Sequence, residues 1–102
     1  MSNGSIQVDD EGRVKIVGEM TFSSTPTLYR ELENRIQSEG HMNAIDLSEV
    51  GRADSSGLAL LLEWQAVAQR HKRKLHIHNA PENLLRLAKL CEADILLDIS
   101  GR

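Results

Sequence analysis

The sequence predicts an α/β fold, a small mixed β-sheet with packed α-helices, because the spacing of its apolar residues changes along the chain. Apolar and polar residues alternate at period two in segments such as 14–17 and 75–78, and apolar residues recur at helical spacing in the segments between them. A chain of 102 residues has room for one hydrophobic core. We therefore expect one domain over residues 1–102.

The first part of the chain predicts a β-hairpin followed by a helix. Residues 6–8 and 13–17 indicate two strands, joined by a tight turn at residues 9–12. A threonine cap and a proline at the first helical position predict a helix over residues 25–38. Gly40 follows that helix and is a typical helix end.

The second part predicts strands that alternate with helices. The expected elements are a buried strand over residues 44–47, a loop over 48–53, a helix over 58–71, a strand over 75–78 and a helix that begins at 79–81. Residues 95–97 indicate a short last strand or an apolar tail.

Cys91 is the only cysteine, so no internal disulfide is expected. Its position on an apolar helical face predicts a buried thiol.

Composition excludes several classes of protein. Lysine and arginine total 12 against 15 aspartate and glutamate, so no basic excess suggests a nucleic-acid partner. The longest apolar run is far shorter than the roughly 20 residues that a membrane span needs. The first five residues lack the basic and apolar regions of a signal peptide. We expect a cytoplasmic protein.

A small hydroxyl-rich turn, Asp54-Ser55-Ser56-Gly57, precedes the most apolar helix and is the first candidate site. Asp54 or Ser55 can cap the helix, and Gly57 allows another surface to approach the backbone closely. Free amides and the helix dipole favour negative charge at such a terminus. A phosphate on Ser55, or an anionic group of a partner, would therefore be stabilised there.

This turn and the strand before it resemble the signature segment of STAS domains. The matching segments are residues 45–50 and 54–62. STAS domains include anti-sigma factor antagonists and the cytoplasmic modules of sulfate transporters. The resemblance covers nearly the whole chain and implies a STAS-type fold. It also implies that Ser55 is the regulatory position, which is phosphorylated in the sigma-factor switches.

Within this family the chain is most similar to the MlaB-like STAS subunits of Mla phospholipid ABC transporters, which maintain lipid asymmetry in Gram-negative outer membranes. The similar segments are residues 46–48, 57–62, 87–90 and 93–96. The resemblance implies a subunit that binds and regulates or stabilises the cytoplasmic ATPase. Through that ATPase it would lie peripherally at the inner membrane, beside the permease.

The turn itself suits the other branch of the family equally well. Ser55-Ser56 stands where the lipid-transport subunits often have a threonine and a glycine. The alternative interpretation is therefore an anti-sigma factor antagonist. Its partner would be an anti-sigma factor kinase, and phosphorylation of Ser55 would break that complex.

The helix after the turn has two apolar stripes. One stripe should face the sheet: Leu58, Leu61, Leu62 and Ala68. The second stripe, Leu60, Trp64 and Val67, is either covered by a neighbouring helix or exposed to a partner, with Trp64 as the anchor. Together with the four residues of the turn, this second stripe is the predicted partner-binding surface.

No catalytic, cofactor or metal site is predicted. Ser55 and Asp54 have no histidine near them in sequence, and no nucleophile elbow or phosphate loop is present. His76 and His78 share one face of a strand, but no further ligand completes a metal-binding spacing. We expect both histidines to be solvent-facing residues of an alternating strand. We expect a protein that is not an enzyme and that binds no cofactor or metal.

Overall fold

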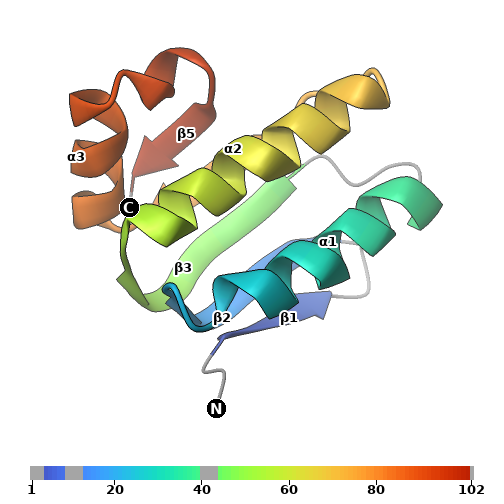
Figure 1. Ribbon diagram of the computed structural model, residues 1–102, viewed down its shortest axis with the longest axis horizontal. Helices are drawn as coiled ribbons and strands as arrows, with labels where there is room; N and C mark the ends of the chain where they lie inside the picture. Colours follow the sequence, from blue (N-terminus) through green and yellow to red (C-terminus); the bar gives the residue numbers. More distant parts are fainter. Residues whose placement is uncertain (1–3, 9–12, 40–43, 102) are drawn as a thin grey trace.

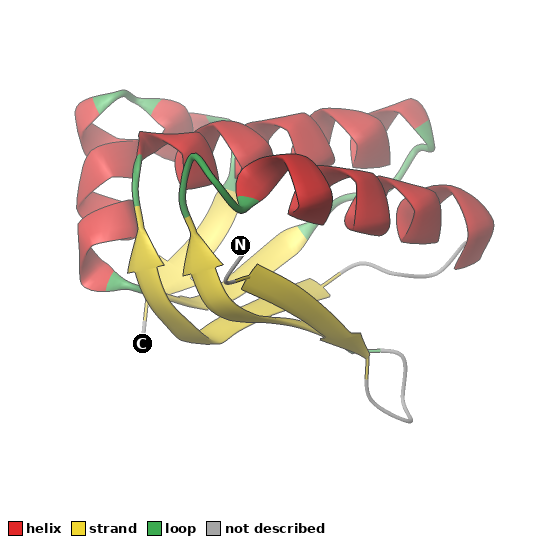
Figure 2. Ribbon diagram, turned by 60° about the horizontal axis from the view of Figure 1, so that its bottom comes forward, coloured by secondary structure: helices red, strands yellow, loops and turns green. Residues whose placement is uncertain are grey.

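Three helices lie on one side of a five-stranded mixed sheet in the computed structural model, which describes residues 4–8, 13–39 and 44–101 (Figures 1 and 2). The strands are β1 (Gly4–Val8), β2 (Val14–Met20), β3 (Ala44–Ala53), β4 (His76–Ala80) and β5 (Asp98–Gly101); the helices are α1 (Thr25–Glu39), α2 (Ser55–Arg70) and α3 (Glu82–Leu90), with a 3-10 turn η1 (Ala93–Ile95). The predicted α/β class and the predicted mixed sheet are confirmed.

The strands follow one another across the sheet in the order β1-β2-β3-β4-β5. The β1–β2 hairpin is antiparallel, as predicted, and the three later pairings are parallel. Each parallel pairing needs a crossover, and crossovers of this kind are right-handed. Because the strand order advances in one direction, all the crossover helices lie on the same face, and the other face, called the bare face below, carries no described helix (Figure 2).

β3 is longer than the sequence predicted. The loop expected over residues 48–53 is wrong, because this segment continues as a strand and pairs with β2 as far as Met20 and Ala53. Two irregularities in the β2–β3 register shift the alternation, so polar residues occur in pairs and resemble a loop in the sequence. The predicted turn over residues 9–12 and the helix end at Gly40 lie outside the described residues.

α2 packs against both of its neighbours, α1 and α3. Of its predicted sheet-facing stripe, Leu58, Leu61 and Ala68 are buried, whereas Leu62 is only half-buried against the core. Of the two alternatives for the second stripe, cover by a neighbouring helix is confirmed and the exposed anchor is wrong: Leu60 is 4% exposed, and Trp64 and Val67 are 0% exposed. α1 covers this stripe, and the Trp64 indole N–H donates to the carbonyl of Tyr29 (3.5 Å). A middle helix buries most of its circumference, which the spacing of its own residues does not reveal.

The remaining predictions concern single residues and the last elements. Cys91 is exposed rather than buried, because α3 ends at Leu90 and the thiol follows the helix at its C-cap. Residues 95–97 form no strand; β5 begins at Asp98 instead.

The buried Gln65 side chain accepts from the Leu75 amide (3.2 Å), which explains how a polar residue interrupts the apolar stripe of α2. None of the described helices is long and apolar enough to cross a membrane.

Truncating the buried tryptophan should unfold the protein rather than only weaken an interface. Trp64→Ala is expected to lower the free energy of unfolding by about 3–5 kcal/mol, because it removes a fully buried indole beneath α1. Urea denaturation followed by circular dichroism measures this. Phe22→Ala is the matched control, since Phe22 is 81% exposed and its truncation should leave the midpoint nearly unchanged. Equal midpoints for the wild-type protein and Trp64→Ala would contradict the packing of α1 over α2.

Candidate partner-docking site

Asp54 joins the starts of two helices. It is the N-cap of α2, and its side chain accepts from the Ser56 amide at 2.9 Å. The second carboxylate oxygen accepts from the amide of Phe22 (3.2 Å), in the loop between β2 and α1. The Asp54 amide itself donates to the carbonyl of Met20 (3.2 Å). One aspartate therefore holds the β2–α1 loop against the first turn of α2.

Gly57 is required by packing inside the chain. A Cβ at this position would lie 2.8 Å from the Met20 carbonyl oxygen and 3.1 Å from the Met20 Cβ. The surface that approaches Gly57 closely is thus the end of β2, and Gly57 is buried. The prediction that Gly57 contacts a partner is corrected: the glycine lets the first turn of α2 pack against β2.

Ser55 and Ser56 remain accessible in the first turn of α2. Ser55 is exposed and Ser56 is half-buried. The predicted stabilisation of an anion here needs correction, because the Asp54 carboxylate already accepts from the Ser56 amide. A phosphate on Ser55 would add roughly −1.5 to −2 charge beside that carboxylate. It would compete for the same amide rather than enter an empty site.

The β2–α1 loop is fixed by its own hydroxyls. Ser24 is fully buried, and its hydroxyl donates to the carbonyl of Glu19 (2.8 Å) while accepting from the Thr21 amide (2.9 Å). With the Asp54 bond to the Phe22 amide, these contacts fix the backbone on both sides of Phe22. A rigid loop therefore presents an aromatic ring that is 81% exposed.

An open apolar groove runs between the first turns of α1 and α2, beside this ring. Its lining residues are Phe22, Thr25, Pro26, Tyr29, Ser56, Ala59, Leu60 and Glu63, and its volume is ≈ 550 Å³. Most of the lining surface is apolar, and Thr25, Tyr29, Ser56 and Glu63 contribute polar groups. A groove of this kind can receive an apolar side chain of another protein.

The structure brings together only part of the predicted surface. Ser56 and Leu60 line the groove, and Asp54 and Ser55 directly precede Ser56, whose amide donates to the Asp54 side chain. Trp64 and Val67 are buried in the core and do not reach it. Phe22 was missed by the sequence analysis. Its only sequence signal is that it is a lone aromatic residue in a loop of serines and threonines.

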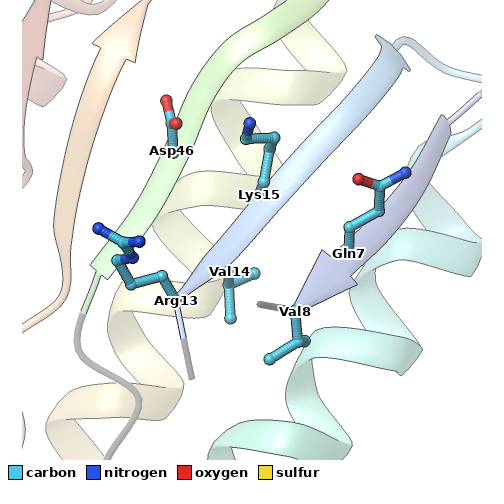
Figure 3. Close-up of a pocket in the computed structure, with 6 residues that line it drawn as sticks. All are labelled: Gln7, Val8, Arg13, Val14, Lys15 and Asp46. Atoms are coloured by element: carbon cyan, nitrogen blue, oxygen red, sulfur yellow. The ribbon is translucent and has the colours of Figure 1, made fainter. Parts of the chain in front are cut away.

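A second cavity lies on the bare face of the sheet (Figure 3). Lys15 and Asp46 face it from the adjacent strands β2 and β3, and Lys15 also pairs with Glu49 (2.9 Å). Asp46 accepts from the Asn79 side chain (3.0 Å) and from the Ser48 amide (2.9 Å). Partial burial raises the pKa of Asp46, but the hydrogen bonds from Asn79 and Ser48 outweigh it and leave the pKa below its ordinary value. These contacts join the strands to one another.

The two histidines on the bare face form a separate small cluster. Their rings are stacked with centroids 6.4 Å apart, and His76 Nδ1 pairs with the Asp98 carboxylate. In the described part of the chain, no group of three or more histidine, cysteine, aspartate or glutamate side chains is placed to hold a metal ion. The groove beside Phe22, with its exposed apolar lining, is the candidate site.

Comparison with solved structures shows the same fold in anti-sigma factor antagonists. A putative anti-sigma factor antagonist from Thermotoga maritima aligns with a TM-score of 0.76 and 14% identity, over 97% of this chain and 86% of that chain. The phosphorylated form of the Bacillus cell fate determinant SpoIIAA aligns with a TM-score of 0.68 and 14% identity, over 97% and 92%. Unphosphorylated SpoIIAA aligns with a TM-score of 0.65 and 15% identity, over 85% and 82%.

Sequence comparison identifies the family. No curated protein matches this chain. The profile of the family described as "Mlab, STAS domain" matches residues 5–98, which include the three helices and strands β2, β3 and β4 in full, β1 without Gly4, and only the first residue of β5. The chain therefore belongs to the STAS domain family, in the group described by that MlaB-like profile.

Proposed function

We propose that this protein is a non-catalytic STAS subunit that binds the cytoplasmic ATPase of a phospholipid ABC transporter of the Mla type. Binding would regulate or stabilise the ATPase and place the subunit beside the inner-membrane permease. The observation that carries the proposal is the MlaB-like family profile over residues 5–98. The groove beside Ser55 supplies the docking surface.

The groove has the composition of a lasting protein interface. Phe22, Pro26 and Ala59 give it exposed apolar lining, and Ser56 and Glu63 supply polar groups. Aromatic side chains held in a fixed geometry are common interface anchors. Phe22 therefore replaces Trp64 as the proposed anchor, because its ring is exposed and its backbone is fixed by Asp54.

The same turn supports a second function, that of an anti-sigma factor antagonist controlled by phosphorylation. The supporting observation is that Ser55 is exposed at the first position of α2. A phosphate there would repel the Asp54 carboxylate and weaken its bonds to the Ser56 and Phe22 amides. Modification would thus change both the charge and the shape of the docking surface.

Changes at Ser55 and Phe22 should weaken partner binding while the fold persists. Ser55→Asp acts through charge, Ser55→Leu through bulk, and Phe22→Ala removes the anchor at a cost of about 2 kcal/mol of binding, or roughly 30-fold in affinity. Ser55→Thr should be nearly neutral, and Ser56→Ala should cost less than any of the disruptive changes. Titration calorimetry with the purified ATPase subunit measures these affinities. Unchanged binding by Ser55→Asp, Ser55→Leu and Phe22→Ala would reduce the turn to an ordinary helix cap.

The Asp54→Asn variant tests the helix cap and the hydrogen bond to the β2–α1 loop separately. Asparagine caps helices as well as aspartate but offers only one acceptor oxygen, so one of the two amide bonds must be lost. We expect the free energy of unfolding to fall by about 1 kcal/mol or less, whereas affinity for the ATPase falls several-fold because Phe22 loses its fixed position. Wild-type affinity in Asp54→Asn would show that this bond does not prepare the groove.

The two functions make different predictions for the purified protein. The transporter subunit should hydrolyse no ATP alone but should change the hydrolysis rate or the thermal stability of the Mla-type ATPase. The antagonist should instead bind an anti-sigma factor kinase and lose that binding once Ser55 is phosphorylated. Assays with both partners and with a Ser55→Ala control decide between them. Binding to the kinase alone, released by ATP, would reject the transporter proposal.

A further inference from the structure

Residues 70–74, Arg-His-Lys-Arg-Lys, form a basic segment at the end of α2. All but Arg73 are exposed, and Arg73 is half-buried. The Lys72 amide donates to the Gln69 carbonyl (2.9 Å) and the Arg73 amide to the Ala68 carbonyl (2.9 Å), so the segment is a hydrogen-bonded turn. Without these four lysines and arginines the chain has eight against 15 acidic residues, so the remainder carries a formal charge of −7. Charge is therefore strongly polarised toward this end.

Exposed apolar side chains lie in the connection from α3 to β5. Leu90 is 81% exposed, Ile95 is 78% exposed and Leu96 is 64% exposed. The 3-10 turn η1 holds Ile95, and the buried Ala93 and Leu97 on either side anchor the connection to the core. Large apolar side chains that a fixed backbone presents to solvent indicate a contact surface.

The topology places the basic segment and these apolar residues at the same end of the sheet, where β4 and β5 begin. β4 and β5 are parallel neighbours, with His76 paired to Asp98. The segments that enter these two strands, residues 70–74 and 95–97, therefore approach the sheet from the same side. The groove lies at the other end of α2. This helix of 16 residues begins near the arrowhead of β3 and ends on the opposite side of the molecule (Figure 1).

We propose that residues 70–74, together with Ile95 and Leu96, form a contact surface for an anionic phospholipid bilayer. Cations attract the anionic headgroups, and neighbouring apolar side chains enter the boundary between headgroups and acyl chains. The remainder of the chain has a net negative charge, which opposes the attraction and so favours contact through this end. The combination favours lipid over an acidic protein segment, since charge pairing alone leaves Ile95 and Leu96 uncovered.

The lipid surface and the groove can be occupied at the same time, because they lie at opposite ends of α2. The lipid contact does not depend on the proposed ATPase partner. Glu92 and Asp94 flank Ile95 and oppose the attraction. The contact is therefore expected to be weak and reversible, and to fall as salt screens the charges.

Vesicle flotation tests the proposal with the full chain. The probes are vesicles of phosphatidylcholine alone and of phosphatidylcholine mixed with phosphatidylglycerol, at low and at high salt. We expect flotation with the anionic vesicles at low salt only. Lys72→Gln with Lys74→Gln should lower the partition coefficient roughly 25-fold, at about fivefold for each cation. Ile95→Ser with Leu96→Ser should lower it further without a change in charge.

Matched controls distinguish a loss of flotation caused by this surface from one caused by a change in net charge or in the groove. Arg30→Gln with Arg52→Gln removes two exposed cations elsewhere and should have a much smaller effect. Ser55→Asp should leave the flotation unchanged, so failure of the ATPase proposal and failure of this one are separable. Circular dichroism verifies that each variant is folded.

Three results would overturn the lipid surface. They are no flotation with anionic vesicles at low salt, equal flotation with phosphatidylcholine alone, and an equal loss in the Arg30→Gln, Arg52→Gln control. If the first of these results is accompanied by binding to heparin beads, the basic segment serves another polyanion.

Discussion

The two hydrogen bonds of the Asp54 carboxylate are the interaction on which the candidate site depends. They link the Ser56 amide, in the first turn of α2, to the Phe22 amide, which precedes α1. The close contact of Gly57 with Met20 makes this geometry possible, because any larger residue would hold α2 away from the end of β2. The groove between the two helices therefore has a fixed shape before any partner binds, which lowers the entropic cost of association.

The one-sided sheet determines which parts of α2 remain available. Strands that follow one another in sequence order place α1, α2 and α3 on a single face, and α2 lies between its two neighbours (Figure 2). Its sides are used for packing, as the burial of Trp64 demonstrates. Besides Ala59, Leu60 and Glu63, which line the groove, α2 offers other molecules its two ends, a hydroxyl-bearing turn with Ser55 at one and a basic segment, residues 70–74, at the other.

This arrangement gives the Ser55 turn a sensitivity to charge that an ordinary helix start lacks. At an uncapped N-terminus an added phosphate is favoured by free amides. Here a carboxylate already accepts from the Ser56 amide, so a second anion at Ser55 acts against Asp54 and, through it, against the position of Phe22. A single modification can thus alter a surface that includes a different loop, without any change in the core.

The sequence by itself determined the α/β class, the hairpin, the helix starts to within three residues and the exposed Ser55, because periodicity and capping are local properties. Tertiary structure alone decided the rest. β3 extends to Ala53 because β2 pairs with it, and Trp64 is buried because α1 covers it. The place of Phe22 beside Asp54 depends on a bond between residues 32 positions apart. No local pattern encodes such contacts, since they depend on which elements become neighbours in the sheet.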